Sequence, residues 1–180
     1  MERSDIYEML KKDHRAVENL YREILEGQRG TMGMAGVTGA EGPMGVSGSP
    51  QMIFSRLYQE LTAHVEAEER TFYAELENKD ETRGDVQEAR REHDEIRNHL
   101  RQVQGQSPGS QEWMSHLQQA QRATVHHVQE EEGKFFNDAQ KVLSEQQARE
   151  IGMRWQQEKM RIMSAAGRGP GMGPGMGPVT

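Results

Sequence analysis

The 180-residue sequence contains no cysteine. Thiolate metal ligands, disulfide bonds and thiol-dependent catalysis are therefore excluded together. A metal site in this chain must use nitrogen and oxygen ligands. With no cysteines to read, the redox conditions of the compartment stay open.

Long hydrophobic runs are also missing. Only 33% of the residues are hydrophobic, 6% are aromatic, and the mean hydropathy is −0.94. No segment approaches the roughly 20 apolar residues that cross a membrane, and the first residues lack the basic and apolar regions of a secretory signal. We therefore expect a cytoplasmic protein with no membrane contact.

Neither sign of charge dominates strongly. The net charge is −7, and acidic and basic residues alternate along the chain without a basic stripe. This pattern is typical of solvated helices and does not favour a nucleic-acid partner.

Two ten-residue stretches share nearly the same pattern. Residues 64–73 read HVEAEERTFY and residues 127–136 read HVQEEEGKFF. In each copy a histidine is followed four positions later by a glutamate, and residues four apart lie on the same face of a helix. Each copy therefore presents one imidazole and one carboxylate together.

A second repeat extends the duplication. Residues 13–19 (DHRAVEN) and residues 92–98 (EHDEIRN) each contain an acid, a histidine, an aliphatic residue and an asparagine in the same order. The chain therefore consists of two halves, each with a single histidine followed by a His-xxx-Glu pair. The first half is longer because it carries a glycine-rich insert.

Hydrophobic residues recur at intervals of three and four in five segments, which predicts helices. The first helix is predicted to begin at Ser4 and to end at Gly27, and the second to begin at Ser49-Pro50. A capping box of Gly84-Asp85 with Glu88 predicts the start of the third helix. The fourth helix is predicted to follow the turn 105–109, and the fifth to begin at Ser144 with Gln147. We predict an all-α fold, an antiparallel up-down four-helix bundle with an additional C-terminal helix of structural role.

Two segments are rich in glycine, proline and methionine. We predict a helical domain over residues 1–163, with an insert loop at 27–49, and a flexible tail at 164–180, because such composition cannot bury a core. The methionines of these segments could bind a soft metal such as Cu(I), scavenge oxidant or mediate self-association, or the segments could be plain flexible linkers.

Six ionisable residues replace apolar residues on the inward faces of the four main helices. A polar group buried without a partner costs about 2–7 kcal/mol, and an unpaired carboxylate costs more. A shared cation removes this cost, and imidazole with carboxylate suits first-row metals held inside bundles. The predicted ligands are His14, His64, Glu68, His93, His127 and Glu131.

The register of the fourth helix needs a choice, because His126 and Glu130 have the same spacing as His127 and Glu131. Alignment of the two copies favours His127. We expect the remaining histidines, His99, His116 and His126, at the surface or behind the ligands. We expect most of the nearby acids, Asp13, Glu66, Glu69 and Glu92, to be surface charges, because adjacent helical residues point about 100° apart. Four aromatic residues should wall the site or form ordinary core: Phe72, Tyr73, Phe135 and Phe136.

The order His, His-xxx-Glu, His, His-xxx-Glu over four helices resembles the hemerythrin-like HHE cation-binding domain, over roughly residues 5–140. The resemblance implies a non-haem di-iron centre, oxo- or hydroxo-bridged, with the four histidines binding iron and Glu68 and Glu131 bridging. Manganese is the less expected metal. The implied partners are small molecules, O₂, NO or H₂O₂.

Two positions depart from the oxygen-carrying hemerythrins of invertebrates. Those proteins have a second histidine one turn after the third-helix histidine, where this chain has Arg97, and their fourth-helix acid aligns with Glu132. One imidazole is therefore missing, which speaks against simple O₂ transport and leaves room for Tyr21, Glu132 or water as a further ligand. A sensor, scavenger or redox protein, an enzyme acting on peroxide or on NO with peroxide, and an iron-responsive structural module all remain open.

Overall fold

The computed structural model describes residues 4–33 and 49–166. The elements are α1 (Ile6–Gly33), α2 (Pro50–Leu76), α3 (Arg83–Gln104), α4 (Gln111–Glu130), a π-helical turn η1 (Glu131–Phe135), α5 (Phe136–Val142) and α6 (Glu145–Ala166). The described ranges contain no strand, so the all-α prediction is confirmed.

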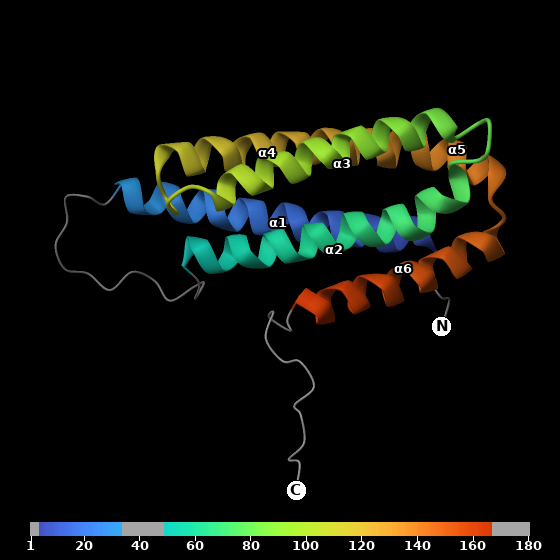
Figure 1. Cartoon of the computed structure of the whole chain (residues 1–180), viewed down its shortest axis with the longest axis horizontal. Coiled ribbons are helices and arrows are strands. Elements are labelled where there is room, and N and C mark those ends of the chain that lie inside the picture. Colours follow the sequence, from blue (N-terminus) through green and yellow to red (C-terminus); the bar gives the residue numbers. More distant parts are fainter. Residues whose placement is uncertain (1–3, 34–48, 167–180) are drawn as a thin grey trace, which may run out of the picture.

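The first four helices form an up-down bundle (Figure 1). Helix α1 packs on α2 and α3 packs on α4, and successive helices run in opposite directions. Helix α6 lies outside this bundle, against α2 and α1. The prediction of a four-helix bundle with an additional C-terminal helix is therefore confirmed.

Several helix starts follow the capping signals. The Ser49 hydroxyl accepts a hydrogen bond from the Met52 amide at 3.3 Å, ahead of Pro50 in the first helical position. At the start of α6, Oε1 of Gln147 accepts from the Ser144 amide at 2.9 Å, and Oγ of Ser144 accepts from the Gln147 amide at 3.3 Å. These reciprocal bonds satisfy amides that a helix start leaves unpaired.

Two predicted boundaries were wrong. Helix α1 does not stop at Gly27 but continues to Gly33. A glycine inside a helix costs only about 1 kcal/mol relative to alanine, so it weakens a helix without ending it. Helix α3 begins at Arg83 rather than at a capping box, and the Thr82 hydroxyl donates instead to the Leu76 carbonyl at 2.8 Å.

The predicted domain limits remain predictions. Helix α6 runs to Ala166, past the boundary expected at 163. Residues 34–48 and 167–180 lie outside the described residues. These ranges contain most of the methionines of the insert and the tail, so the roles considered for those methionines remain predictions.

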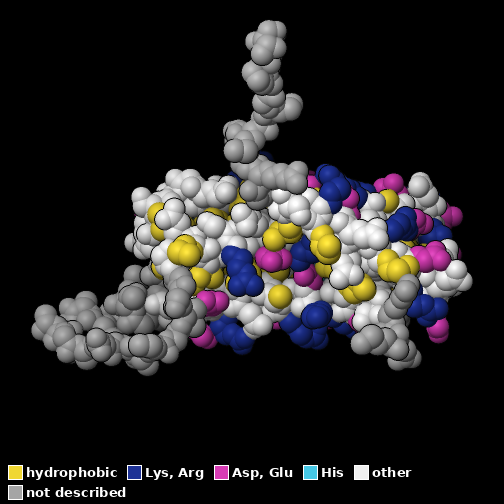
Figure 2. Space-filling view, turned by 90° about the horizontal axis from the view of Figure 1, so that it is seen from below, with side chains coloured by type: hydrophobic (Ala, Val, Ile, Leu, Met, Phe, Trp, Pro, Cys, Tyr) yellow, Lys and Arg dark blue, Asp and Glu magenta, His cyan; other side chains and the backbone are white. Residues whose placement is uncertain are grey.

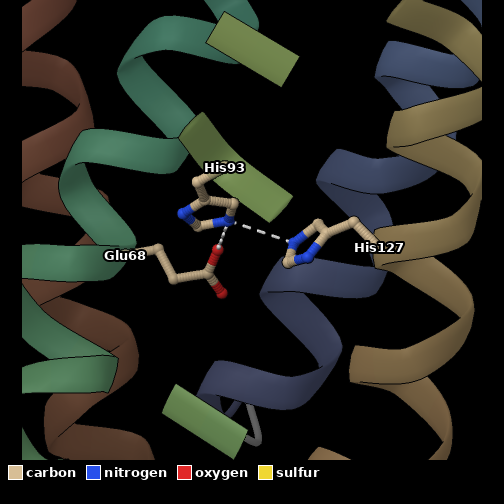
Figure 3. A group of neighbouring side chains, drawn as sticks. All are labelled: Glu68, His93 and His127. Carbon is tan, nitrogen blue, oxygen red and sulfur yellow. Dashed lines mark hydrogen bonds and ion pairs between the residues drawn. The ribbon is translucent and has the colours of Figure 1, made fainter. Parts of the chain in front are cut away.

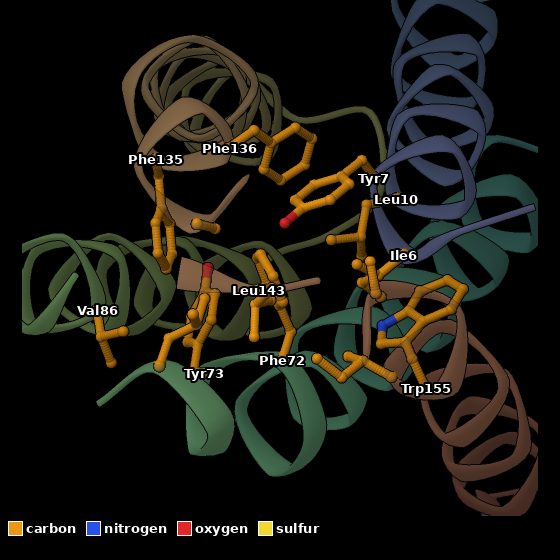
Figure 4. Close-up of a cluster of buried hydrophobic side chains, with 14 of the residues drawn as sticks. Ile6, Tyr7, Leu10, Phe72, Tyr73, Val86, Phe135, Phe136, Leu143 and Trp155 are labelled. Carbon is orange, nitrogen blue, oxygen red and sulfur yellow. The ribbon is translucent and has the colours of Figure 1, made fainter. Parts of the chain in front are cut away.

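Two apolar clusters fill the bundle. One cluster, at the end nearest the start of α1, contains Ile6, Tyr7, Leu10, Ala67, Phe72, Tyr73, Leu76, Val86, Ala89, Phe135, Phe136, Ala139, Leu143, Ala148, Ile151 and Trp155 (Figure 4). The other contains Val17, Leu20, Tyr21, Ile24, Phe54, Leu57, Leu61, Val65, Ile96, Leu100, Val103, Trp113, Leu117 and Ala120. On each of the four bundle helices, the residues predicted as ligands lie where residues of one cluster give way to residues of the other.

The surface carries mixed charge. On the face shown in Figure 2, acidic and basic side chains are interspersed among scattered hydrophobic groups, with no continuous band of either sign. Within the described ranges, no helix combines the length and apolar character needed to cross a membrane.

Candidate metal centre

Each of the six predicted ligands is buried, with at most 3% of its surface exposed. Helix α1 supplies His14, α2 supplies His64 and Glu68, α3 supplies His93, and α4 with the π turn supplies His127 and Glu131. The structure therefore brings all six side chains into the interior of one bundle, each from the helix predicted for it.

The four imidazoles form two pairs. The ring centres of His14 and His64 are 4.9 Å apart, and those of His93 and His127 are 4.5 Å apart. Within the second pair, the two Nε2 atoms lie 3.1 Å from each other. Helices α1 and α2 thus supply one pair and α3 and α4 the other.

Each glutamate reaches both histidine pairs. Oε2 of Glu68 lies 3.4 Å from Nε2 of His64 and 3.5 Å from Nε2 of His93. Figure 3 shows Glu68, His93 and His127 pointing toward one another, and one ligand atom from each lies within 4.8 Å of the others.

The second glutamate repeats this arrangement across the centre. Oε2 of Glu131 lies 3.3 Å from Nε2 of His14 and 3.8 Å from Nε2 of His127. The two carboxylates therefore each stand between one imidazole of the first pair and one of the second.

Several inward atoms make no hydrogen bond to any described residue. They are Nε2 of His14, Nε2 of His64, both carboxylate oxygens of Glu68, and Oε2 of Glu131. Buried polar atoms are nearly always satisfied in native proteins, so each such atom requires an explanation. Five such atoms facing the interior between the two histidine pairs fit bound cations better than they fit a closed hydrogen-bond network.

On the outward side of the rings, every one of the four Nδ1 atoms meets a carboxylate oxygen. The distances are 2.8 Å from His14 to Glu132, 2.7 Å from His64 to Asp13, 2.9 Å from His93 to Glu69 and 3.0 Å from His127 to Glu92. An ionised carboxylate only accepts, so each Nδ1 donates, and each Nε2 is left with a lone pair that faces the centre. This is the arrangement usual for metal-bound histidine.

The expectation that most nearby acids are surface charges was therefore wrong for three of them. Asp13, Glu69 and Glu92 serve histidines of other helices, while Glu66 pairs with Arg70 at the surface as expected. A helix cannot direct an acid onto the imidazole next to it in sequence, but it can direct that acid onto a neighbouring helix. This relationship depends on packing and has no local signal in the sequence.

The two positions that depart from oxygen carriers also support the rings from outside. Arg97 donates to Oε1 of Glu69 at 2.8 Å, the same oxygen that accepts from His93. Glu132 bonds to Nδ1 of His14, so it lies behind that ring rather than at the centre. Tyr21 is bonded to the Thr124 hydroxyl at 3.1 Å. The structure thus gives both residues considered as extra ligands another partner.

Tyr73 is the tyrosine that touches the centre. Its hydroxyl donates to Oε1 of Glu131 at 3.0 Å and lies 3.4 Å from Nε2 of His93, and its ring stacks on the His93 ring at 5.3 Å. Sequence reasoning placed this residue only as a possible wall. Its position in the repeat, matched by Phe136 in the second copy, was the available signal.

Glu131 opens a π-helical turn that the periodicity did not predict. Such turns are rare, widen the helix locally and often occur at functional sites. At this turn two consecutive acids contact one imidazole. Glu131 faces Nε2 of His14, and Glu132 faces Nδ1 of the same ring.

The neighbouring histidines of α4 point in opposite directions. The side chain of His127 is 3% exposed, whereas that of His126 is 66% exposed, and both donate to Glu92. The structure therefore places His127, and not His126, at the centre. The other two histidines, His99 and His116, are half-buried and lie outside the cluster.

Burial disfavours the ionised form of both glutamates. Burial, together with the nearby Glu131, raises the pKa of Glu68 well above its usual value. Burial also acts to raise the pKa of Glu131, but the imidazoles of His14 and His127 outweigh it and hold that pKa at about 2. Two buried carboxylates this close cannot both be ionised without added positive charge. The pair therefore needs either a proton or a cation.

Comparison with known proteins agrees with this architecture. A family model described as Hemerythrin HHE cation binding domain matches residues 5–139. The crystal structure of a Hemerythrin HHE cation binding domain-containing protein from Mycobacterium kansasii aligns with a TM-score of 0.68 at 19% identity, covering 91% of this chain and 90% of that one. This similarity shows the shared fold, and the family match confirms the resemblance found in the sequence.

One curated relative has a different description. A protein of Nostoc sp. named DNA nickase is 27% identical over 173 residues. The match covers 91% of this chain but only 41% of the relative. The chain therefore spans about two-fifths of that protein.

Proposed function

Because the chain belongs to the hemerythrin HHE cation-binding domain family, we propose that it binds two iron ions at the buried cluster and uses them to bind or react with O₂, NO or H₂O₂. His14 and His64 would hold one ion, and His93 and His127 would hold the other. Glu68 and Glu131 would supply carboxylate oxygens to both. Iron suits this set of imidazole and carboxylate ligands, and manganese is the alternative metal.

The observation that carries the proposal is the position of the two glutamates. Each carboxylate lies between one histidine of the first pair and one of the second, at 3.3–3.8 Å from the Nε2 atoms. A single cation would not require both acids to span both pairs. Two carboxylates that each link two nitrogen pairs are the natural bridges of a two-metal site.

A surface hollow reaches one of the two bridging candidates. It is half-open, lies between α3 and the π turn, and is lined by Asp85, Glu92, Glu131, Lys134 and Phe135. A small molecule would approach Glu131 through this hollow.

Bound iron would supply an electrophilic, redox-active centre with a position open to a small molecule. The chain supplies the rest. Its four carboxylates fix the imidazole rings, the two apolar clusters exclude bulk water, and the Tyr73 hydroxyl holds a proton beside Glu131 and His93. Its single proton is donated to Oε1 of Glu131, so the hydroxyl orients that carboxylate within the centre.

The proposal includes no nucleic-acid partner. The activity named for the Nostoc relative belongs to a protein of which the match covers 41%. The net charge of −7, and the mixed charge on the face shown in Figure 2, give no separate support for DNA binding. The expected result of a gel-shift assay with single-stranded and duplex DNA is no shift at 100 mM salt. A salt-sensitive shift would contradict this part of the proposal.

A turnover experiment with H₂O₂ distinguishes an enzyme from a protein that only binds the small molecule. The iron-loaded protein is mixed with a large excess of H₂O₂ over iron, and peroxide decay is followed together with the optical spectrum. Decay of many equivalents, lost in Glu131→Ala, indicates an enzyme. A spectral change complete after about one equivalent indicates a sensor or scavenger. No response to O₂, NO or H₂O₂ would contradict the proposed function and leave a structural metal site.

A further inference from the structure

Helix α6 is connected directly to the histidine cluster. It packs against α2 and α1, and its Gly152 lies so close to α1 that a β-carbon there would stand 3.0 Å from the Ile6 amide nitrogen. From this position α6 directs two large side chains, Trp155 and Lys159, toward the outer side of His64. Figure 4 shows Trp155 at the border between α6 and the apolar cluster.

Lys159 forms a chain of contacts that ends at an inward imidazole. Its ammonium group donates to Oδ1 of Asp13 and lies 2.9 Å from Oε2 of Glu60. The other carboxylate oxygen of Asp13 accepts from Nδ1 of His64 at 2.7 Å. Asp13 is therefore held between one residue of α6 and one of α2, with a different oxygen directed to each.

The Lys159 side chain is well protected from solvent. It is 13% exposed, Asp13 is 17% exposed, and the ammonium group lies 5.6 Å from the ring centre of Trp155. Ion pairs at exposed sites contribute little, but a pair shielded in this way is screened less by water.

Trp155 supports the same imidazole from a second direction. Its ring meets the His64 ring edge to face, with the centres 5.7 Å apart and the planes at 80°. The His64 ring is thus fixed by Asp13 at Nδ1 and by Trp155 along its face. Trp155 of α6 contacts the ring directly, and Lys159 of α6 acts on it through Asp13.

The other pair of histidines is supported differently. The carboxylate behind His93, Glu69, is neutralised by Arg97 and Arg90 from α3. These arginines belong to the four-helix bundle itself. Of the four described carboxylates behind the rings, Asp13 is the one that pairs with a cation from α6.

We propose that Lys159 is a positioning residue, which fixes His64 through Asp13 and thereby controls how firmly the ion on the His14 and His64 side is held. The inference rests on the proposed two-metal site. Its consequence is that the two metal positions are unequal, one secured by the bundle and one secured from outside by α6. Movement of α6 would loosen one ion and leave the other in place.

The first experiment uses the full chain loaded with Fe(II) without oxygen and then mixed with a chelator. In Lys159→Met, one of two equivalents should leave faster than in the unchanged protein, by up to about tenfold, with the second equivalent unaffected. The variant loosens Asp13, and outright loss of such an outer partner of a metal-bound histidine costs about 10–100-fold in affinity. Lys159→Arg should restore slow release, because its guanidinium also donates to Asp13.

The matched control is Arg154→Met. Arg154 also lies on α6 and pairs with a carboxylate of α2, Glu75, at 2.7 Å, but this pair has no link to a histidine. The control removes a salt bridge between α6 and α2, as Lys159→Met does at Glu60, but leaves the contact between Lys159 and Asp13 of α1 in place. Equal release from Arg154→Met and Lys159→Met, or equal acceleration of both ions, would overturn the proposal.

A second measurement does not depend on metal loading. In the metal-free protein, NMR of ¹⁵N-labelled histidine should show the ring nitrogens of His64 shifted in Lys159→Met and unshifted in Arg154→Met, with His93 unchanged in both. Unmoved His64 signals in Lys159→Met would refute the positioning role. Failure of the unchanged protein to bind two equivalents would instead refute the proposed function, while the NMR result still decides whether Lys159 positions His64.

Discussion

The Tyr73 hydroxyl donates a hydrogen bond of 3.0 Å to Oε1 of Glu131, the glutamate whose other oxygen faces two imidazoles. The tyrosine is fully buried, and burial with the nearby Glu131 raises its pKa well above the ordinary value. It therefore keeps its proton at all ordinary pH values. One oxygen of Glu131 is thus held by the protein, and only the other remains directed at the centre.

Replacing Tyr73 by phenylalanine removes this donor and keeps the ring. We expect Tyr73→Phe to lower the free energy of unfolding of the metal-free protein by about 1–3 kcal/mol, because a buried acceptor is left unsatisfied. Urea unfolding with equal m-values measures the change. Tyr58→Phe, on the outer side of the other cluster, is the matched control and should cost less. Equal stability of Tyr73→Phe and the unchanged protein would show that the bond contributes nothing.

The adjacent histidines of α4 offer a direct test of register. His127→Ala should reduce bound iron below two equivalents per chain, and His126→Ala should leave it at two, because only His127 faces the cluster. Both residues bond to Glu92, so loss of a contact with that acid is common to the two variants. Metal analysis after desalting measures the difference. Loss of iron in His126→Ala with retention in His127→Ala would place the site one residue away.

Metal removal should destabilise the folded chain, because the site does not exist in the unfolded state. With free metal 100-fold above its dissociation constant, binding stabilises by about 2.7 kcal/mol. For a domain of this size, that raises Tm by about 5–10 °C. Thermal unfolding followed by circular dichroism, with and without chelator, measures the shift. His126→Ala should show the same shift, and an unchanged Tm on metal removal would contradict metal binding at a preformed core site.

The folded state lowers the pKa of Asp13 to about 2, against an ordinary value of 3.8. A carboxyl group with a lowered folded-state pKa stabilises the protein above its unfolded pKa and loses that contribution as pH falls through the folded value. Each pKa unit corresponds to about 1.4 kcal/mol, so about 2 kcal/mol should disappear between pH 4 and pH 2. In metal-free Asp13→Asn, the fall in unfolding free energy over this range should be smaller by that amount. Asp80→Asn, at an exposed acid paired with Arg83, should leave the fall unchanged.

The six inward residues were predictable because the sequence repeats them. A polar pair at a four-residue spacing on an apolar face is a local signal. Because the pair occurs twice, as His64–Glu68 and His127–Glu131, the pattern is much less probable by chance than a single pair. The bundle follows from the same periodicity. The start of α2 at Ser49-Pro50 and that of α6 at Ser144 were predictable because capping depends on residues within one turn of each other.

The contacts behind the imidazoles were not predictable from local pattern. Asp13 precedes His14 in the sequence but bonds to His64, and Glu92 precedes His93 but bonds to His127. Helical geometry turns each acid away from its neighbour and toward the next helix, so its partner is fixed only by packing. The π turn at Glu131 was likewise not predictable, because the hydrophobic periodicity runs through it as in an ordinary helix. The link from Lys159 to Asp13 joins residues on opposite ends of the chain.

The most direct test of the account is the metal content of the purified chain and of variants at the two bridging acids. The full chain, reconstituted with Fe(II) and desalted, should retain two iron ions, and Glu68→Ala combined with Glu131→Ala should retain none while keeping its helical circular dichroism. Two ions retained by the double variant, or none retained by the unchanged chain under conditions that load a known hemerythrin, would contradict a carboxylate-bridged two-metal centre.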